Sequence, residues 1–236
     1  ASDVSRANAK EKNAGNSEND MAQDARRMIR ASETVLAPVY APLAEHLVQK
    51  FDLAQKEGVG IDVGSGPGTL IIELCRRTEN LHWINADINP HFFPHFLHMA
   101  EENGFSGRVS AVRADAKNLP FRSNYADFIV SRGSYHFWGG IKEGFSEVYR
   151  VLKPGAVAWI GRGLSPNMPV DLARKMRSKQ GKKMKYDPTD KADEMRAAMK
   201  ELGISTYKIH IPEPEGAENV NYGLWIEIHK PEEKSK

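Results

Sequence analysis

A turn containing three glycines carries the strongest chemical signal in this chain of 236 residues. It joins an apolar strand to a helix within residues 60–70. Because Gly64, Gly66 and Gly68 have no Cβ atom, the backbone of the turn can adopt positive φ and approach a ligand closely. Asp62 precedes the turn, at a position where a buried strand normally has an aliphatic side chain. A buried carboxylate is costly unless a cation meets it, so the turn predicts a nucleoside-bearing ligand with a cationic group.

Two further acids end the next two predicted strands. Asp87 closes the apolar run 82–86, and its carboxylate can accept hydrogen bonds from both hydroxyls of a ribose. Asp115, followed by Ala116, closes the run 109–114, where an adenine amino group could be bound. One exposed aspartate at a strand end is common, but acids at three successive strand ends are hard to explain by packing. The pattern therefore predicts one nucleoside site across neighbouring strand ends.

The cation expected beside Asp62 separates two classes of nucleoside ligand. S-adenosylmethionine (SAM) carries an ammonium on its methionine part, whereas a carboxylate would repel the pyrophosphate of NAD. Dinucleotide-binding domains also use a glycine-rich turn, so the turn alone does not decide between the two. Asp62 favours SAM, and an NAD-dependent oxidoreductase is the second enzyme class to consider.

A segment rich in functional groups follows the fourth predicted strand, over residues 131–140. Open α/β sheets bind ligands beyond the carboxyl ends of their strands, so we expect the substrate to bind near this segment. His136 is a candidate base, or a residue that positions the backbone around the ligand. Arg132 is a candidate contact for an acidic substrate group, or the partner of an acid in the core.

Taken in order, these motifs resemble those of the class I SAM-dependent methyltransferases. The similarity extends over residues 58–162 and the final pair of strands, and it is strongest to the branch of ubiquinone/menaquinone C-methyltransferases and many small-molecule enzymes. The segments that carry it are Asp62–Gly68, Asp87, Asp115–Phe121, Asp127–Ser131 and Glu147–Gly155.

The resemblance implies a role for each matching residue. Asp62 and the glycine turn would hold the methionine end of SAM, and Asp87 the ribose. Asp115 and Ala116 would contact the adenine, and Ile88 would lie against its ring. SAM would be the cofactor, S-adenosylhomocysteine (SAH) its product, and a small molecule the acceptor. The expected cofactor-binding residues are Asp62, Gly64, Ser65, Gly66, Gly68, Asp87, Ile88, Asp115, Ala116 and Ser131.

Strands and helices alternate through the centre of the chain, which predicts parallel strands joined by helical crossovers. The last two predicted strands, 206–211 and 224–229, are joined by a loop too short for a crossover helix and should pair as an antiparallel hairpin. A reversed last strand distinguishes a methyltransferase sheet from a dinucleotide-binding sheet. We expect an α/β fold with a Rossmann-like seven-stranded sheet, an antiparallel last strand, helices on both faces and a helical N-terminal cap.

The chain is expected to divide into five segments. The first lacks aromatic residues and is polar, which predicts a mobile arm or a frayed helix. In order, the segments are an N-terminal arm (1–20), a helical cap (21–57), a SAM-binding core (58–162), a helical insertion that covers the acceptor (163–203) and a terminal hairpin with a short tail (204–236).

Composition limits the class of protein. Hydrophobic residues make up 40% of the chain, and no apolar run approaches the roughly 20 residues that span a bilayer. The net charge of +2 does not indicate a general polyanion binder. The single cysteine, Cys75, excludes an internal disulfide, and its apolar helix 69–77 predicts a packing role. We expect a monomer or homodimer in the cytoplasm, where SAM is made; the start Ala1-Ser2-Asp3 leaves export open.

Three histidines follow helix spacing after the second strand: His91, His95 and His98. On one helix face they would allow a divalent metal. Pro94 lies among them and would kink a helix unless it stands in the first turns. We prefer a polar helix face with aromatic residues turned inward, and we expect no metal.

A basic run without acids lies between Arg174 and Lys185. It could contact RNA phosphates or an anionic membrane. An insertion at this place more often covers the acceptor or forms a solvated helix, and no RNA-binding module is visible. A small-molecule methyltransferase is therefore the expected function. The alternative is an RNA methyltransferase, or a non-catalytic SAM- or RNA-binding regulator that uses residues 174–185.

Overall fold

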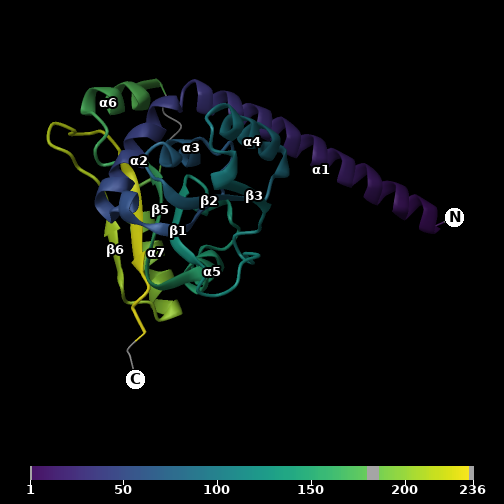
Figure 1. Cartoon of the computed structure of the whole chain (residues 1–236). Helices are drawn as coiled ribbons and strands as arrows, with labels where there is room; N and C mark the ends of the chain where they lie inside the picture. Colours follow the sequence, from purple (N-terminus) through teal and green to yellow (C-terminus); the bar gives the residue numbers. More distant parts are fainter. Residues whose placement is uncertain (1, 180–185, 234–236) are drawn as a thin grey trace.

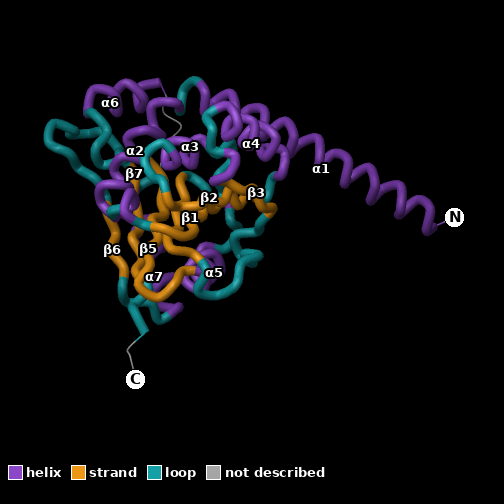
Figure 2. Tube along the Cα trace, in the orientation of Figure 1, coloured by secondary structure: helices purple, strands orange, loops and turns teal. Residues whose placement is uncertain are grey.

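A seven-stranded sheet forms the centre of the computed structural model, which describes residues 2–179 and 186–233 (Figures 1 and 2). The strand order is β3-β2-β1-β4-β5-β7-β6; β1 to β5 pair in parallel, and β7 runs antiparallel to both of its neighbours. This confirms the predicted α/β fold and its reversed last strand. The strands are β1 Glu57–Val63, β2 Asn80–Asp87, β3 Val109–Arg113, β4 Ala126–Arg132, β5 Leu152–Gly163, β6 Tyr207–His210 and β7 Gly223–His229.

Helices cover both faces of the sheet (Figure 1). On one face, α2, α3 and α4 contribute the fully buried side chains of Leu43, Ile71 and Phe96. On the other, α5 and α7 contribute those of Phe145 and Met195. The helices are α1 Ser2–Glu33, α2 Ala37–Phe51, α3 Thr69–Cys75, α4 Phe93–Glu102, α5 Ile141–Val151, α6 Val170–Lys179 and α7 Pro188–Leu202, with short 3-10 turns η1 Leu53–Gln55, η2 Pro90–Phe92, η3 Ser106–Arg108 and η4 Tyr135–Phe137.

The alternation of side chains along β1 decides where its acid points. Ile61 and Val63 belong to the core beneath α5 and α7. Successive side chains of a strand point to opposite faces, so Asp62 lies on the side of α2 and α3. Cys75, at the end of α3, is buried in the core on that side, and burial raises the pKa of its thiol to about 11. A protonated thiol in an apolar core fits the packing role predicted for it.

Helix α1 is continuous from Ser2 to Glu33 and extends away from the sheet toward its N-terminus (Figure 1). It is attached to the turn η2, after β2, by two polar contacts. The Met21 carbonyl accepts a 2.8 Å hydrogen bond from Asn89, and Glu18 lies 2.8 Å from the His91 ring. No break in the helix marks the predicted division near residue 20, which stays a prediction.

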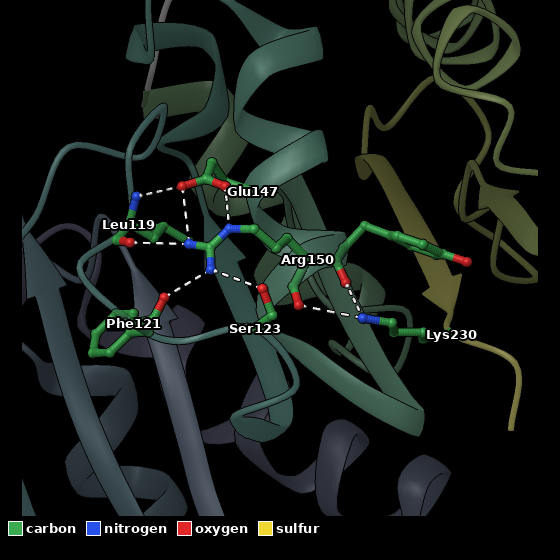
Figure 3. A network of polar contacts seen from close by, with 7 residues as sticks. Leu119, Phe121, Ser123, Glu147, Arg150 and Lys230 are labelled. Atoms are coloured by element: carbon green, nitrogen blue, oxygen red, sulfur yellow. Dashed lines mark hydrogen bonds and ion pairs between the residues drawn. The ribbon is translucent and has the colours of Figure 1, made fainter. Parts of the chain in front are cut away.

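A polar network fastens the loop between β3 and β4 to helix α5 (Figure 3). The Arg150 guanidinium donates to the carbonyls of Leu119 and Phe121, at 3.1 and 2.8 Å, and to Glu147. Glu147 in turn accepts a 2.9 Å hydrogen bond from the Leu119 amide. The hydrogen bond from Arg150 lowers the pKa of Glu147. The network therefore fixes the path of the loop that begins at Asp115.

We expect Arg150→Gln to lower the free energy of unfolding by about 1–3 kcal/mol, because the loop carbonyls lose a charged donor and Glu147 loses its ion partner. Urea unfolding measures the loss. Arg122→Gln is the matched control, since Arg122 is an exposed arginine of the same loop that lies over the ring of Tyr125. It should change stability by less than about 0.5 kcal/mol. Equal effects of the two substitutions would contradict the role given to the network.

Candidate functional site

The three glycines after β1 adopt the left-handed backbone that the sequence predicts, with φ of 70°, 56° and 79° at Gly64, Gly66 and Gly68. A Cβ atom on Gly64 would lie 1.8 Å from the Ser134 hydroxyl oxygen, and one on Gly68 would lie 2.2 Å from the ring of Phe96. The turn therefore lies against the loop after β4 and against α4 at distances that only glycine permits.

The end of β2 holds the middle of the turn. Asp87 accepts hydrogen bonds from the amides of Gly66, at 2.7 Å, and Asn89, at 2.9 Å. Asn85 donates to the Gly66 carbonyl at 3.0 Å. Burial raises the pKa of Asp87, and the backbone hydrogen bonds oppose that effect. Each carboxylate oxygen of Asp87 retains a lone pair that could accept from a ligand hydroxyl.

Asp62 is a buried carboxylic acid that forms no ion pair within the described ranges. Its side chain is 3% exposed, and it accepts a 2.8 Å hydrogen bond from the Ser65 hydroxyl. Burial raises the pKa of Asp62 to about 7, and the nearby Asp87 adds to the rise. The described residues place no Lys, Arg or His within ion-pair distance of it. A cation of a ligand would supply the missing charge.

A cavity of about 610 Å³ opens beside the glycine turn, and we call it the cofactor cavity. Its walls come from the ends of β1 and β2, from the loops after β3 and β4, and from α1. Asp87 and Asp115 provide carboxylates at separate places on its wall. The predicted residues that line it are Gly64, Gly66, Asp87, Ile88, Asp115 and Ala116.

Four predicted cofactor residues lie behind the wall of the cofactor cavity. Asp62 and Ser65 bond to each other beneath the turn. Gly68 is the N-cap of α3, and Ser131 is fully buried, with its hydroxyl donating to the Val63 carbonyl at 2.6 Å. Gly68 and Ser131 do not line the cofactor cavity, and their contacts with a cofactor stay a prediction.

Helix α1, part of which falls in the helical cap predicted for residues 21–57, supplies part of the wall. Asp24, Arg27 and Met28 line the cofactor cavity, and Arg27 pairs with Asp24 at 2.9 Å. Their spacing of three and four residues places them on one helix face, and this spacing is the feature of the sequence that could have indicated a shared surface. Ile88 and Phe137 also line the cavity and are 56% and 79% exposed. Such large exposed apolar side chains would be covered by a planar ring.

Arg132 lies near Asp62 but forms no ion pair with a carboxylate in the described ranges. Its guanidinium is 5.7 Å from the centre of the Tyr40 ring. Its Nε atom is shielded from solvent and finds no hydrogen-bond partner among the residues that the structure describes. Burial lowers the pKa of Arg132. Of the two predicted roles of Arg132, the ion pair with an acid of the core is therefore not seen among the described residues.

His136 does not reach the cofactor cavity. It lines a smaller cavity on the other side of residues 133–140, together with Arg162 and Lys191. Its ring contacts that of Phe137, with 4.0 Å between the ring centres. Burial, followed by the charges of Arg162 and Lys191, lowers the pKa of His136, so the imidazole is neutral at pH 7. The structure thus separates the candidate base from the predicted cofactor residues.

The three histidines considered for a metal each face a different carboxylate. His91 lies 2.8 Å from Glu18, and His98 lies 3.4 Å from Glu102. His95 lies 4.0 Å from Glu33. Pro94 stands in the first turn of α4 and does not break it. Within the part of the chain that the structure describes, no group of three or more His, Cys, Asp or Glu side chains could hold a metal ion.

Two residues of the basic run attach α6 to the loop before β7. Arg174 donates to the Gly216 carbonyl at 3.0 Å, and Arg177 to the Asn221 carbonyl at 2.6 Å. Lys182, Lys183 and Lys185 of the same run lie outside the described residues.

A further cavity, of about 690 Å³, lies between this loop and the start of α7. Its lining includes the acids Asp187, Glu213, Glu215 and Glu218 but none of the predicted site residues. It is larger than the cofactor cavity, but it lacks the glycine turn and the strand-end acids, so we do not assign the nucleoside site to it. None of the helices in the described ranges combines the length and the apolar character of a membrane span.

The cofactor cavity fits a ligand that has a ribose, a planar base and a cationic end. Asp87 is placed for ribose hydroxyls, and Asp115 and Ala116 are placed for the edge of a base. The glycine turn leaves space that a Cβ would fill, and Asp62 behind it forms no ion pair with any of the described residues. These features agree with SAM and give no support for a pyrophosphate beside Asp62.

Sequence comparisons identify relatives among methyltransferases. A family model described as a methyltransferase domain matches residues 61–155. A chloroplastic 2-methyl-6-phytyl-1,4-hydroquinone methyltransferase of Arabidopsis thaliana is 32% identical over 118 residues, which cover 49% of this chain and 33% of that protein. A ubiquinone/menaquinone biosynthesis C-methyltransferase of Vibrio cholerae is 33% identical over 96 residues, 40% of this chain and 37% of that protein. The chain thus spans about a third of the length of these curated relatives.

Solved structures share the fold over most of the chain. A proposed SAM-dependent methyltransferase from Methanococcus maripaludis gives a TM-score of 0.78 at 29% identity, and the match covers 91% of this chain and 95% of that one. A SAM-dependent methyltransferase from Aquifex aeolicus gives a TM-score of 0.62 at 17% identity over 88% of this chain and 97% of that one, a likeness of fold alone.

We expect Gly64→Ala to weaken SAH binding by at least about tenfold, because the new Cβ collides with Ser134 and the cavity wall must move. Isothermal titration calorimetry measures the affinity. Gly104→Ala is the matched control, since Gly104 also has positive φ, at 76°, but has no atom within 4 Å of the new Cβ. The double variant with Ser134→Gly should recover much of the affinity. An unaffected Gly64→Ala protein would contradict the close approach.

Proposed function

We propose that the chain is a class I SAM-dependent methyltransferase, which transfers a methyl group from SAM to a small-molecule acceptor by direct displacement and releases SAH. The proposal rests on the cofactor cavity. There, Asp87 at the end of β2 accepts a hydrogen bond from the glycine turn and also lines the cavity with its carboxylate. The curated relatives extend beyond the matched segment, so their activities enter here as support only.

The residues of the cofactor cavity divide the binding task. Asp87 would accept the ribose hydroxyls, and Asp115 with Ala116 would meet the adenine edge. Ile88 would cover the adenine ring, and the 56% exposure of the Ile88 side chain leaves its apolar surface available for this contact. Asp62 would balance the ammonium of the methionine part from beneath the turn.

When bound, SAM supplies a methyl group on a sulfonium, which is already activated for displacement. The chain therefore has to orient the acceptor and exclude water, and neither task requires a covalent intermediate. The aromatic side chains of Phe137 and Trp138, on the wall of the cavity, can provide an apolar surface and attract a cation. We assign no proton transfer to His136, since it faces the neighbouring cavity.

The acceptor is proposed to be a small molecule. The relatives named above are, by their names, a methyltransferase of a hydroquinone and a C-methyltransferase of ubiquinone/menaquinone biosynthesis, so hydroquinone-type ring compounds are the first acceptors to assay. We propose that residues 163–203 cover the acceptor, as expected from their place before the last hairpin. The RNA alternative gains no support from Arg174 and Arg177, whose side chains attach α6 to a neighbouring loop.

Methyl-labelled SAM, incubated with the purified protein and host extract, should leave its label in the small-molecule fraction. Asp87→Ala should reduce transfer by at least about a hundredfold, because the ribose loses its acceptor and the turn loses its anchor. Asp193→Ala is the control, since Asp193 forms an exposed pair with Arg196 on α7. Label in the RNA fraction would support the alternative function, and transfer that survives Asp87→Ala would contradict the proposed site.

The affinity for SAH should rise with pH up to about pH 7 and then level off. Because the pKa of Asp62 is raised to about 7, the carboxyl is protonated below that pH and must lose its proton to balance an ammonium. The gain should approach about tenfold per pH unit below the pKa. Calorimetric titration between pH 5.5 and 8 measures it. Asp62→Asn should flatten the profile, as should 5′-methylthioadenosine, which lacks the amino-acid part; a steep profile for either would refute the role of Asp62.

A further inference from the structure

A second cavity, of about 230 Å³, adjoins the cofactor cavity, and we call it the η4 cavity. It lies between the turn η4, the start of α5, the end of β5 and the helix α7. Gly139 lines both cavities, so they lie on either side of residues 133–140. The charged and titratable groups of its wall include His136, Arg162, Lys191 and Glu194.

Arg162 is the fixed cation of the η4 cavity. Its guanidinium lies 4.5 Å from the centre of the Tyr186 ring, and the Tyr186 hydroxyl donates to the Arg162 carbonyl at 2.8 Å. In the described ranges, the guanidinium forms neither an ion pair nor a hydrogen bond with another side chain. A stacked guanidinium with unused N–H groups is well suited to bind an oxyanion through two parallel hydrogen bonds.

Lys191 adds a second cation that can turn toward the same place. It pairs with Glu194 of its own helix at 2.6 Å, and both side chains are substantially exposed. Such an exposed pair is worth little, so an anion in the cavity could recruit Lys191 at small cost. Two cations and one carboxylate leave this wall with a net positive charge. Glu143, in the first turn of α5, lies against Gly140 at the margin of the cavity.

His136 completes the group on the side of η4. Its ring is held between Tyr135, at 5.6 Å, and Phe137, at 4.0 Å, measured between ring centres. The charged groups on the elements around it are Arg162 of β5 and Lys191 and Glu194 of α7. The two cations favour its neutral form, in which one ring nitrogen can donate a hydrogen bond.

We propose that the η4 cavity binds a phosphate-type oxyanion, with Arg162 as the main contact and Lys191 and His136 as additional donors. The proposal rests on the cation cluster and the cavity, and it does not depend on methyl transfer. The same chemistry would bind free phosphate or the phosphate ester of a small molecule, including an acceptor. It also gives His136 a binding role on the far side of the loop from SAM.

The titration of His136, followed by NMR, tests the proposal without any assay of activity. The chain has 8 histidines, and the signal of His136 is the one absent from His136→Gln. Saturating inorganic phosphate, compared with chloride, should raise the midpoint of this signal by about one pH unit or more, because the anion stabilises the imidazolium. The signals of His82 and His46, which lie outside the cavity, should move much less.

Calorimetric titration with inorganic phosphate tests the contact residues. Arg162→Gln should weaken binding at least tenfold, and Arg162→Lys by less. Arg122→Gln should have no effect, because Arg122 also lies over a tyrosine ring, at 5.6 Å, but outside this cavity. If Arg162→Gln does not fold, by circular dichroism, Lys191→Gln should still weaken binding about threefold.

Two further arms separate the possible outcomes. SAH titrations of the same variants should stay near the wild-type affinity, which distinguishes failure of this site from failure of the cofactor site. Tighter binding of glycerol 3-phosphate than of phosphate would assign the site to a phosphate ester, and the reverse order to the free ion; both support an oxyanion site. An unmoved His136 midpoint, with equal phosphate affinity of Arg162→Gln and Arg122→Gln, would overturn the proposal.

Discussion

The close approach of the turn after β1 to its neighbours is the constraint on which the site depends. The backbone of Gly64 lies against Ser134, and the backbone of Gly68 lies against Phe96, at distances that exclude any side chain. Asp87 and Asn85 bind both the amide and the carbonyl of Gly66, so the end of β2 sets the position of the turn. The strand ends and the loop after β4 can therefore surround a single cavity.

Buried acidic side chains and a cluster of cations lie on opposite sides of the loop after β4. Asp62 and Asp87 are buried acids on the side of the cofactor cavity, and burial raises the pKa of both. Arg162 lies on the other side of the loop after β4, among further cations. Buried groups of one sign are costly alone. The two cavities are therefore suited to ligand groups of opposite charge.

Local signals in the sequence are enough to bring part of the site together. Glycine spacing specifies a turn, and strand-end acids specify which sheet edge they share, so Gly64, Asp87 and Asp115 line one cavity, and their contacts with the cofactor stay a prediction. The reversed β7 follows from a loop that is too short for a crossover. Each of these inferences needs only neighbouring residues and the rules of parallel sheets.

The remaining parts depend on packing between distant elements. Motif matching does not show the structural bond of the Ser131 hydroxyl to the Val63 carbonyl, and the predicted contact of Ser131 with the cofactor stays a prediction. The direction of His136 is set by the turn η4, which places it on one side of the loop and Phe137 on the other. The contribution of Asp24 and Arg27 requires α1 to dock near η2, over a long stretch of intervening chain.

The central claim is that the cofactor cavity binds SAM and its product, and paired calorimetric titrations of the unmodified chain with SAH and NADH test it most directly. We predict saturable binding of SAH with a stoichiometry of about one, and no detectable heat from NADH, because Asp62 balances an ammonium and repels a pyrophosphate. Binding of NADH without binding of SAH would contradict SAM binding in this cavity. The glycine turn would then be interpreted as a dinucleotide-binding turn.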